Sequence, residues 1–173
     1  ALDFEATTGR FMLAYRGYSG DPFIAIGNIS NTSTNAMTWG SGADPSSGGG
    51  ADIKRLGVTS IGSSKGVLTW SQGGDIKAAL FTVSNSANSV TLQTAISYST
   101  SGATYQHPVM VWDPEYSKVV IMFRDNSDSG KLKAIHSAVS GTTLAAFGTH
   151  CVVHSYDSTH NQYWLGYNTY SGG

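Results

Sequence analysis

The residues most suited to chemistry are acids that recur at one position of a repeated pattern. Glu5, Asp113 and Asp157 each follow an aromatic residue, and each lies ten residues before a second aromatic that closes an apolar segment. Carboxylates can act as general acids or bases, but they can also accept hydrogen bonds from backbone N–H groups and fix a turn. Because an active site is built once and a turn in every repeat, the recurrence favours a structural role. Paired carboxylates of the glycoside-hydrolase kind stay open, since they would meet only in space.

Two further segments contain metal-ligand residue types. In the first, Cys151 lies between His150 and His154. Side chains on a strand alternate between its faces, so the histidines would share one face and the thiol would lie on the other. A single zinc ion could not easily be held by all three from one strand. We expect a buried thiol and two histidines on a polar face.

The second segment, residues 125–130, reads Asp-Asn-Ser-Asp-Ser-Gly. It offers oxygen ligands at short spacing, but it lacks the acidic ligand that completes an EF-hand calcium loop. A hairpin turn is the better interpretation. We expect no metal and no cofactor. The five histidines show no partner pattern for a nucleophile, so we also expect no catalysis.

The elements that must position these residues form a tandem repeat. Four apolar segments end on the aromatics Tyr15, Trp70, Phe123 and Tyr167, which lie 55, 53 and 44 positions apart. The second copy has Ser60 where the others have the acid. We expect the four aromatics to fill the core between neighbouring repeats.

Each repeat continues as a series of short strands. A second strand is expected at residues 23–26, 76–81 and 132–138 of the successive repeats. A third strand is expected at 37–39, 90–92 and 144–147, and a final short strand at 151–153. The unit is therefore about four antiparallel strands in about 50 residues, and no segment has the apolar spacing of a helix. Such units indicate an all-β fold built from β-propeller-like blades. A β-sandwich or β-barrel with coincidental strand spacing is the alternative.

The repeat also sets the domain organisation. We assign repeat 1 to residues 1–58, with a flexible Gly- and Ser-rich loop at 40–50, repeat 2 to 59–108, repeat 3 to 109–155 and a partial repeat 4 to 156–173. Closed propellers use about four to eight blades, so three full blades and a partial fourth indicate a fragment of a longer protein. The short last interval indicates either a degenerate fourth repeat or residues missing between Val153 and Tyr156.

Composition excludes other classes of protein. The chain has 173 residues, with 10 Lys and Arg against 11 Asp and Glu. This balance leaves no excess of positive charge to neutralise phosphates, so we expect no nucleic-acid partner. No apolar run approaches the length of about 20 residues that a membrane span needs. The single cysteine cannot form an intrachain disulfide.

The third repeat carries a resemblance to a known group of proteins. Its Trp112-Asp113 pair, the strand end Phe123-Arg124-Asp125 and the Val-Ser-Gly-Thr turn at 139–142 resemble a tandem repeat of phage virion proteins. The resemblance implies a part of a virion appendage, such as a tail fibre, tail-tip protein or adhesin, at the virion surface or otherwise extracellular. It implies other virion proteins or further copies of the chain as partners, and contact with the host envelope. It does not identify a ligand, and host-surface glycan is the ligand class that we expect.

Recognition residues are expected outside the strands, where a ring can stack on a sugar or fill a partner pocket. The candidates are tyrosines of predicted turns or loops and arginines that follow a closing aromatic: Tyr18, Tyr105, Tyr116, Tyr170, Arg16 and Arg124. We expect a non-enzymatic protein that serves structure or host-surface recognition. The alternatives are a propeller-type glycoside hydrolase and a purely structural decoration protein of the particle.

Overall fold

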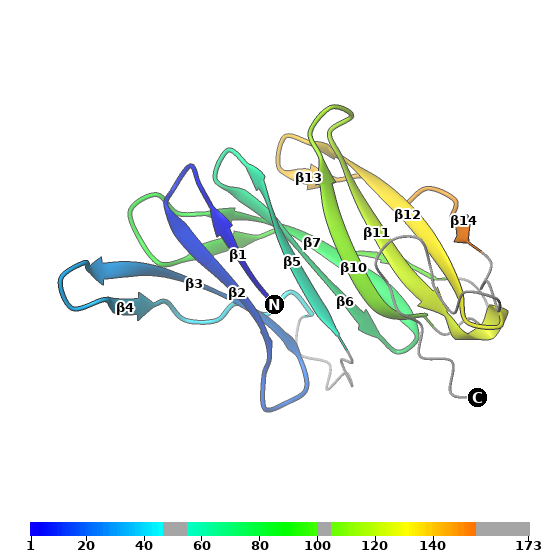
Figure 1. Cartoon of the computed structure of the whole chain (residues 1–173), viewed down its shortest axis with the longest axis horizontal. Helices are drawn as coiled ribbons and strands as arrows, with labels where there is room; N and C mark the ends of the chain where they lie inside the picture. Colours follow the sequence, from blue (N-terminus) through cyan, green and yellow to red (C-terminus); the bar gives the residue numbers. More distant parts are fainter. Residues whose placement is uncertain (47–54, 100–104, 155–173) are drawn as a thin grey trace.

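The computed structural model describes residues 1–46, 55–99 and 105–154, and only the backbone of 105–106 and 151–154. These residues form three antiparallel sheets of four or five strands, which follow one another in chain order (Figure 1). They include no α-helix, and their helical turn is the short 3-10 segment η1 (Asn126–Asp128). The prediction of an all-β fold is confirmed. Within the described ranges, no helix has the length and apolar character to cross a membrane.

Sheet 1 is a meander with the strand order β1-β2-β3-β4. Its strands are β1 (Leu2–Glu5), β2 (Arg10–Arg16), β3 (Pro22–Asn31) and β4 (Ala36–Trp39). The hairpin between β2 and β3 is paired from Phe11 opposite Gly27 to Arg16 opposite Pro22. Because side chains alternate along each strand, this register assigns every second residue to the same face.

Sheets 2 and 3 repeat the meander. Sheet 2 contains β5 (Leu56–Gly62), β6 (Lys65–Gln72), β7 (Asp75–Val83), β8 (Val90–Leu92) and β9 (Ile96–Tyr98). Sheet 3 contains β10 (Tyr105–Asp113), β11 (Lys118–Asp125), β12 (Lys131–Ser140), β13 (Thr143–Leu144) and β14 (Cys151–His154). In each sheet the third strand pairs with two short strands in succession, so the outermost strand is broken in two.

One sequence expectation about these outer strands is wrong. The strand expected at 144–147 ends at Leu144: Ala145 and Gly148 still donate backbone hydrogen bonds to Ala138 and His136 of β12, but regular strand pairing resumes only at β14. In the described part of the 40–50 loop, Ala43 and Ile24 exchange backbone hydrogen bonds of 2.9 and 3.0 Å. This bridge is the sheet 1 counterpart of β9 and β14. Residues 47–54 of that loop lie outside the described part of the chain.

The core lies between the sheets. Between sheets 1 and 2, side chains from β2 and β3 meet side chains from β6 and β7: Met12, Ala14, Ile24, Ile26, Leu68, Trp70, Ala79, Phe81 and Val83. Between sheets 2 and 3, a second cluster contains Val67, Ile76, Ala78, Leu80, Tyr98, Val119, Ile121, Phe123 and Ile135. Sheet 2 is therefore covered on both faces.

The closing aromatics do not all lie in this core. Trp70 and Phe123 are fully buried, as expected, but Tyr15 is 37% exposed. Trp70 faces sheet 1 and Phe123 faces sheet 2, so each packs against the preceding sheet. Tyr15 occupies the same position in sheet 1, where the described chain supplies no preceding sheet. Tyr167 lies outside the described residues.

Candidate functional site

The candidate recognition residues lie at two opposite ends of the sheets. Tyr18 is fully exposed in the β2–β3 turn, at the lower end in Figure 1, and Tyr116 is 65% exposed in the β10–β11 turn, at the upper end. The backbone of Tyr105 begins β10 opposite Asp125, which also places it at the lower end. Tyr170 lies outside the described residues. Of the candidate tyrosines with described side chains, Tyr18 and Tyr116 therefore lie at opposite ends of the sheets.

The two arginines and the residue at the equivalent position of sheet 2 differ in burial. Arg16 and Arg124 are exposed near the ends of β2 and β11. Arg124 lies against Gly130, because a Cβ atom there would come within 2.9 Å of its guanidinium group. Ser71 holds this position in β6, where it is 2% exposed and its hydroxyl is the buried side-chain atom without a hydrogen bond in the described chain. Ser71 is therefore enclosed, whereas the arginines at the equivalent positions are exposed.

The recurring acids fix turns, as their recurrence predicts. Glu5 is buried and accepts hydrogen bonds from the backbone N–H groups of Thr7 and Thr8 at 3.1 and 2.7 Å and from the Thr8 hydroxyl at 2.7 Å. Burial alone would raise the pKa of Glu5, but these hydrogen bonds outweigh it and hold the pKa below its ordinary value. Asp113 accepts from the N–H groups of Glu115 and Tyr116 in the same way. Asp157 lies outside the described residues.

The segment 125–130 forms the predicted hairpin turn, and a lysine fills the position that a cation would take. Asp125 accepts hydrogen bonds from the backbone N–H and hydroxyl of Ser127 and caps η1. The ammonium of Lys133 lies 2.7 Å from Asp125 and 2.9 Å from Asp128. Burial would raise the pKa of Asp125, but the bond from Lys133 and those from Ser127 lower it overall. The carboxylates are therefore already neutralised by the chain itself.

Of the histidine and cysteine segment, the structure describes the side chain of His150, while the side chains of Cys151 and His154 lie outside the described residues. His150 precedes β14 and shares a hydrogen bond between its Nδ1 and the hydroxyl of Tyr98. Phe147 also packs against Tyr98, with ring centroids 6.3 Å apart. Residues 97–99 and 146–150 enclose a shallow hollow of about 430 Å³ here. Among the side chains that the structure describes, no three His, Cys, Asp or Glu residues gather.

One sequence motif has the spacing of a catalytic serine site, and its place in the fold shows whether it could act as one. Residues 62–66 read Gly-Ser-Ser-Lys-Gly, which matches the Gly-x-Ser-x-Gly spacing of a nucleophile elbow. Such an elbow joins a strand to a helix and raises its serine above the sheet. Here Ser63 and Ser64, with φ of 54° and 60°, form the tight turn between β5 and β6. Two left-handed residues are the requirement of a two-residue hairpin, so the motif is a turn.

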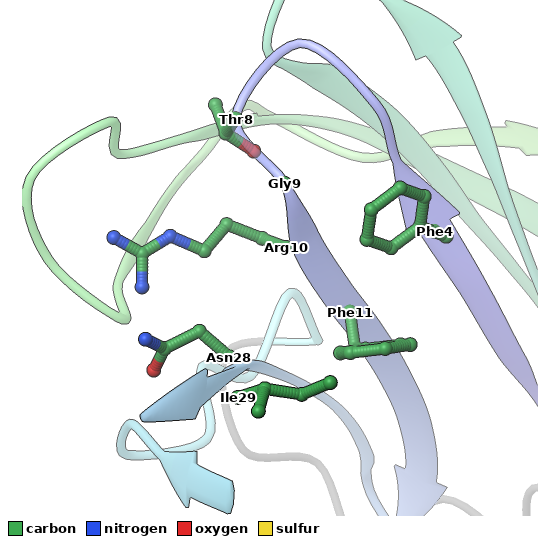
Figure 2. Close-up of a pocket in the computed structure, with 7 residues that line it drawn as sticks. All are labelled: Phe4, Thr8, Gly9, Arg10, Phe11, Asn28 and Ile29. Atoms are coloured by element: carbon green, nitrogen blue, oxygen red, sulfur yellow. The ribbon is translucent and has the colours of Figure 1, made fainter. Parts of the chain in front are cut away.

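A pocket of about 410 Å³ lies where β2 and β3 diverge at the edge of sheet 1 (Figure 2). Its lining residues are Phe4, Thr8, Gly9, Arg10, Phe11, Asn28 and Ile29. The rings of Phe4 and Phe11 lie on one side, with centroids 5.2 Å apart, and Arg10 and Asn28 lie on the other (Figure 2). The pocket is thus half apolar and half polar.

The polar half is used to join two sheets. Asn88, in the turn between β7 and β8, accepts a hydrogen bond from Arg10 and donates one of 2.9 Å to Asn28. It also donates to the backbone carbonyl of Thr38 at 3.0 Å. The sequence signal for this contact is a recurring basic residue, because Arg10, Lys65 and Lys118 each begin the second strand of their sheet. The apolar half of the pocket has no such partner among the described residues.

No protein-family model, curated protein or solved structure matches this chain.

Proposed function

We propose that the chain is a non-catalytic, β-propeller-type part of a phage virion appendage that contacts the host surface through exposed turns. Three four- or five-stranded meanders with cores between them support this proposal, because successive propeller blades are stacked in the same way. The observation that carries the recognition role is Tyr18, whose ring is fully exposed at the end of a turn. Tyrosine in such a place supplies a large contact area at low entropic cost, and loops on a rigid scaffold are the usual sites of binding.

The state of the carboxylates supports binding over hydrolysis. A glycoside hydrolase needs one carboxyl group that gives up a proton and a second that stabilises charge or activates water. Glu5 and Asp113 accept hydrogen bonds from their own turns, and Asp125 is paired with Lys133. These groups serve as hydrogen-bond acceptors with a structural role. They are poorly suited to donate a proton to a sugar.

The proposal is tested by binding of the chain to host-envelope glycans on an array and to whole host cells. The variants are Tyr18→Ala and Tyr116→Ala, one at each end of the sheets. We expect retention to fall at least tenfold for the variant at the recognition end only, because stacking of a ring on a sugar is lost. Retention unchanged in both variants, or absent for the chain itself, would leave the structural decoration role. Release of reducing sugar from host polysaccharide would overturn the non-catalytic assignment.

A further inference from the structure

Sheet 1 presents an uncovered apolar surface on the side away from sheet 2. Its members, here called the open face of sheet 1, are Leu2, Phe4, Phe11, Leu13, Tyr15, Phe23, Ile29, Met37 and Trp39. Leu2 is 62% exposed, and Phe4, Ile29, Met37 and Trp39 are each between 42% and 47% exposed. The side chains are ordered against one another, since Tyr15 stacks on Phe23 with centroids 5.5 Å apart. A continuous apolar surface of this kind marks an interaction site.

The same face is covered in the two other sheets. Alignment on the first residue of the second strand makes Leu13 equivalent to Leu68 and Ile121, and both of these are fully buried. Leu68 is buried by sheet 1, and Ile121 by sheet 2. The structure therefore shows twice what this face packs against, which is the opposite face of a preceding sheet.

The faces of sheets 1 and 2 that cover the following sheet are mostly aliphatic, and so is the outer side of sheet 3. The aromatic Trp70 packs on Met12 and Ala14 of sheet 1, and Phe123 belongs to the cluster that contains Val67 and Leu80 of sheet 2. Aromatic rings thus lie on one side of each interface and mostly aliphatic side chains on the other.

The outer side of sheet 3 carries aliphatic side chains at the positions equivalent to Met12 of sheet 1 and Val67 of sheet 2. Val120 and Met122 belong to β11, and Val109 and Val111 pair with them from β10. Val109 and Val111 are 40% and 51% exposed. This surface, the open face of sheet 3, is aliphatic at Val109, Val111, Val120 and Met122, where the open face of sheet 1 is aromatic, and the exposed His136 and Arg124 lie beside these residues on the same face.

A polar contact recurs at the rim of each established interface. Arg10 of sheet 1 reaches the β7–β8 turn of sheet 2 by bonding to Asn88. The equivalent Lys65 of sheet 2 donates a hydrogen bond of 2.7 Å to the carbonyl of Gly141, in the β12–β13 turn of sheet 3. In sheet 3 the equivalent residue is Lys118. The turn that it would reach is the β3–β4 turn of a sheet 1, residues 32–35.

We propose that the open face of sheet 1 binds the open face of sheet 3 of a second copy of this chain. The contact is head to tail, because two different faces meet, and such contacts form rings when the rotation closes. The three described sheets of each copy would together contribute six sheets to such a ring, within the range of about four to eight that propellers use. The apolar half of the pocket in Figure 2, lined by Phe4, Phe11 and Ile29, would receive an aliphatic side chain of the partner.

The test is the mass of the chain in solution, measured by light scattering and sedimentation. We expect the chain to have twice the mass of one copy. Phe4→Glu on one face and Val111→Glu on the other should each weaken self-association by about a hundredfold or more, because each buries an unpaired carboxylate. An equimolar mixture of the two variants should form dimers again, since each retains the face that the other has lost.

Controls separate this contact from its alternatives. Ser19→Glu adds the same charge in an exposed turn away from both faces and should leave the mass unchanged. Leu2→Glu, at the most exposed position of the open face of sheet 1, repeats the test if Phe4→Glu does not fold. Dimers of Val111→Glu alone would show that two copies of sheet 1 meet face to face and would overturn the proposal. A chain that stays a single copy at high concentration would also overturn it and would leave a sheet of another protein as the occupant.

Discussion

Sheet 1 and sheet 2 are built alike but are buried to different extents. The closing aromatic of sheet 2, Trp70, is fully buried, whereas that of sheet 1, Tyr15, is 37% exposed. The difference arises from the neighbours: sheet 2 lies between two sheets, and sheet 1 has one. A repeated sequence can therefore encode the strand, the face and the residue type of a position, while its burial depends on what stacks next to it.

The largest expected effect comes from replacing the two closing aromatics, Trp70 and Tyr15, with alanine. Trp70→Ala should lower the free energy of unfolding by about 3–5 kcal/mol, the usual cost of deleting a buried aromatic ring. Tyr15→Ala should cost about 1 kcal/mol or less, because a half-exposed ring loses less burial. Urea unfolding followed by fluorescence and circular dichroism measures both. Equal losses would mean that Tyr15 is covered in solution.

The hairpin after β11 offers a second comparison, between two lysines in one turn. Lys133 and Asp125 are both buried, with side-chain exposures of 7% and 3%, whereas Lys131 and Asp128 are 39% and 37% exposed. Lys133→Met leaves Asp125 as a buried charge without its lysine and should cost about 3–5 kcal/mol. Lys131→Met should cost less than about 1 kcal/mol. Thermal unfolding of the two variants at pH 7 separates these outcomes, and similar losses would contradict the pairing.

The same pair has a pH dependence with a defined sign. The pKa of Asp125 lies below its ordinary value of 3.8, so its contribution is present above pH 3.8 and is lost as the pH falls through the folded-state pKa. Burial would lower the pKa of Lys133, but bonds to Asp125 and Asp128 raise it above 10.5. The contribution of Lys133 to stability is therefore complete below pH 10.5 and is lost as the pH rises through its folded-state pKa. The stability difference between the chain and Lys133→Met should be largest between these two limits.

A smaller effect is expected from a valine placed at equivalent positions of β2 and β6. Gly66 corresponds to Phe11, but a Cβ at Gly66 would lie 2.4 Å from the Phe81 ring and 2.9 Å from the sulfur of Met12. Gly66→Val should cost about 1–3 kcal/mol by overpacking. Phe11→Val, on the open face of sheet 1, should cost less because its site is partly open. A stable Gly66→Val variant would show that the two sheets can move apart.

Much of the fold was predictable because it is local. The strands around Tyr15, Trp70 and Phe123 follow from alternation and turn residues, and the acids at 5 and 113 were assigned to turns on their recurrence alone. Burial of Tyr15 was predicted wrongly, since no local signal says which sheet stacks outside it. The role of Asn88 was also missed, because its partner Arg10 is 78 positions away in the sequence. Contacts between repeats depend on the stacking geometry, which the pattern within one repeat does not contain.

The smallest effect concerns the turns that begin β2 and β11. Glu5 is buried and Asp113 is half-buried, yet both accept hydrogen bonds from two backbone N–H groups. Glu5→Gln should cost about 1–2 kcal/mol, because a neutral amide accepts these bonds less strongly than a carboxylate. Asp113→Asn should cost less than about 1 kcal/mol, since water can replace its lost bonds.

The pH dependence of the first variant identifies its cause. The folded-state pKa of Glu5 lies below its ordinary value of 4.5, so the stabilisation is complete above that pH and disappears as the pH falls through the folded-state pKa. The difference in unfolding free energy between the chain and Glu5→Gln should therefore shrink as the pH is lowered below 4.5. A difference that stays constant over this range would mean that the shape of the side chain, and not its charge, holds the turn.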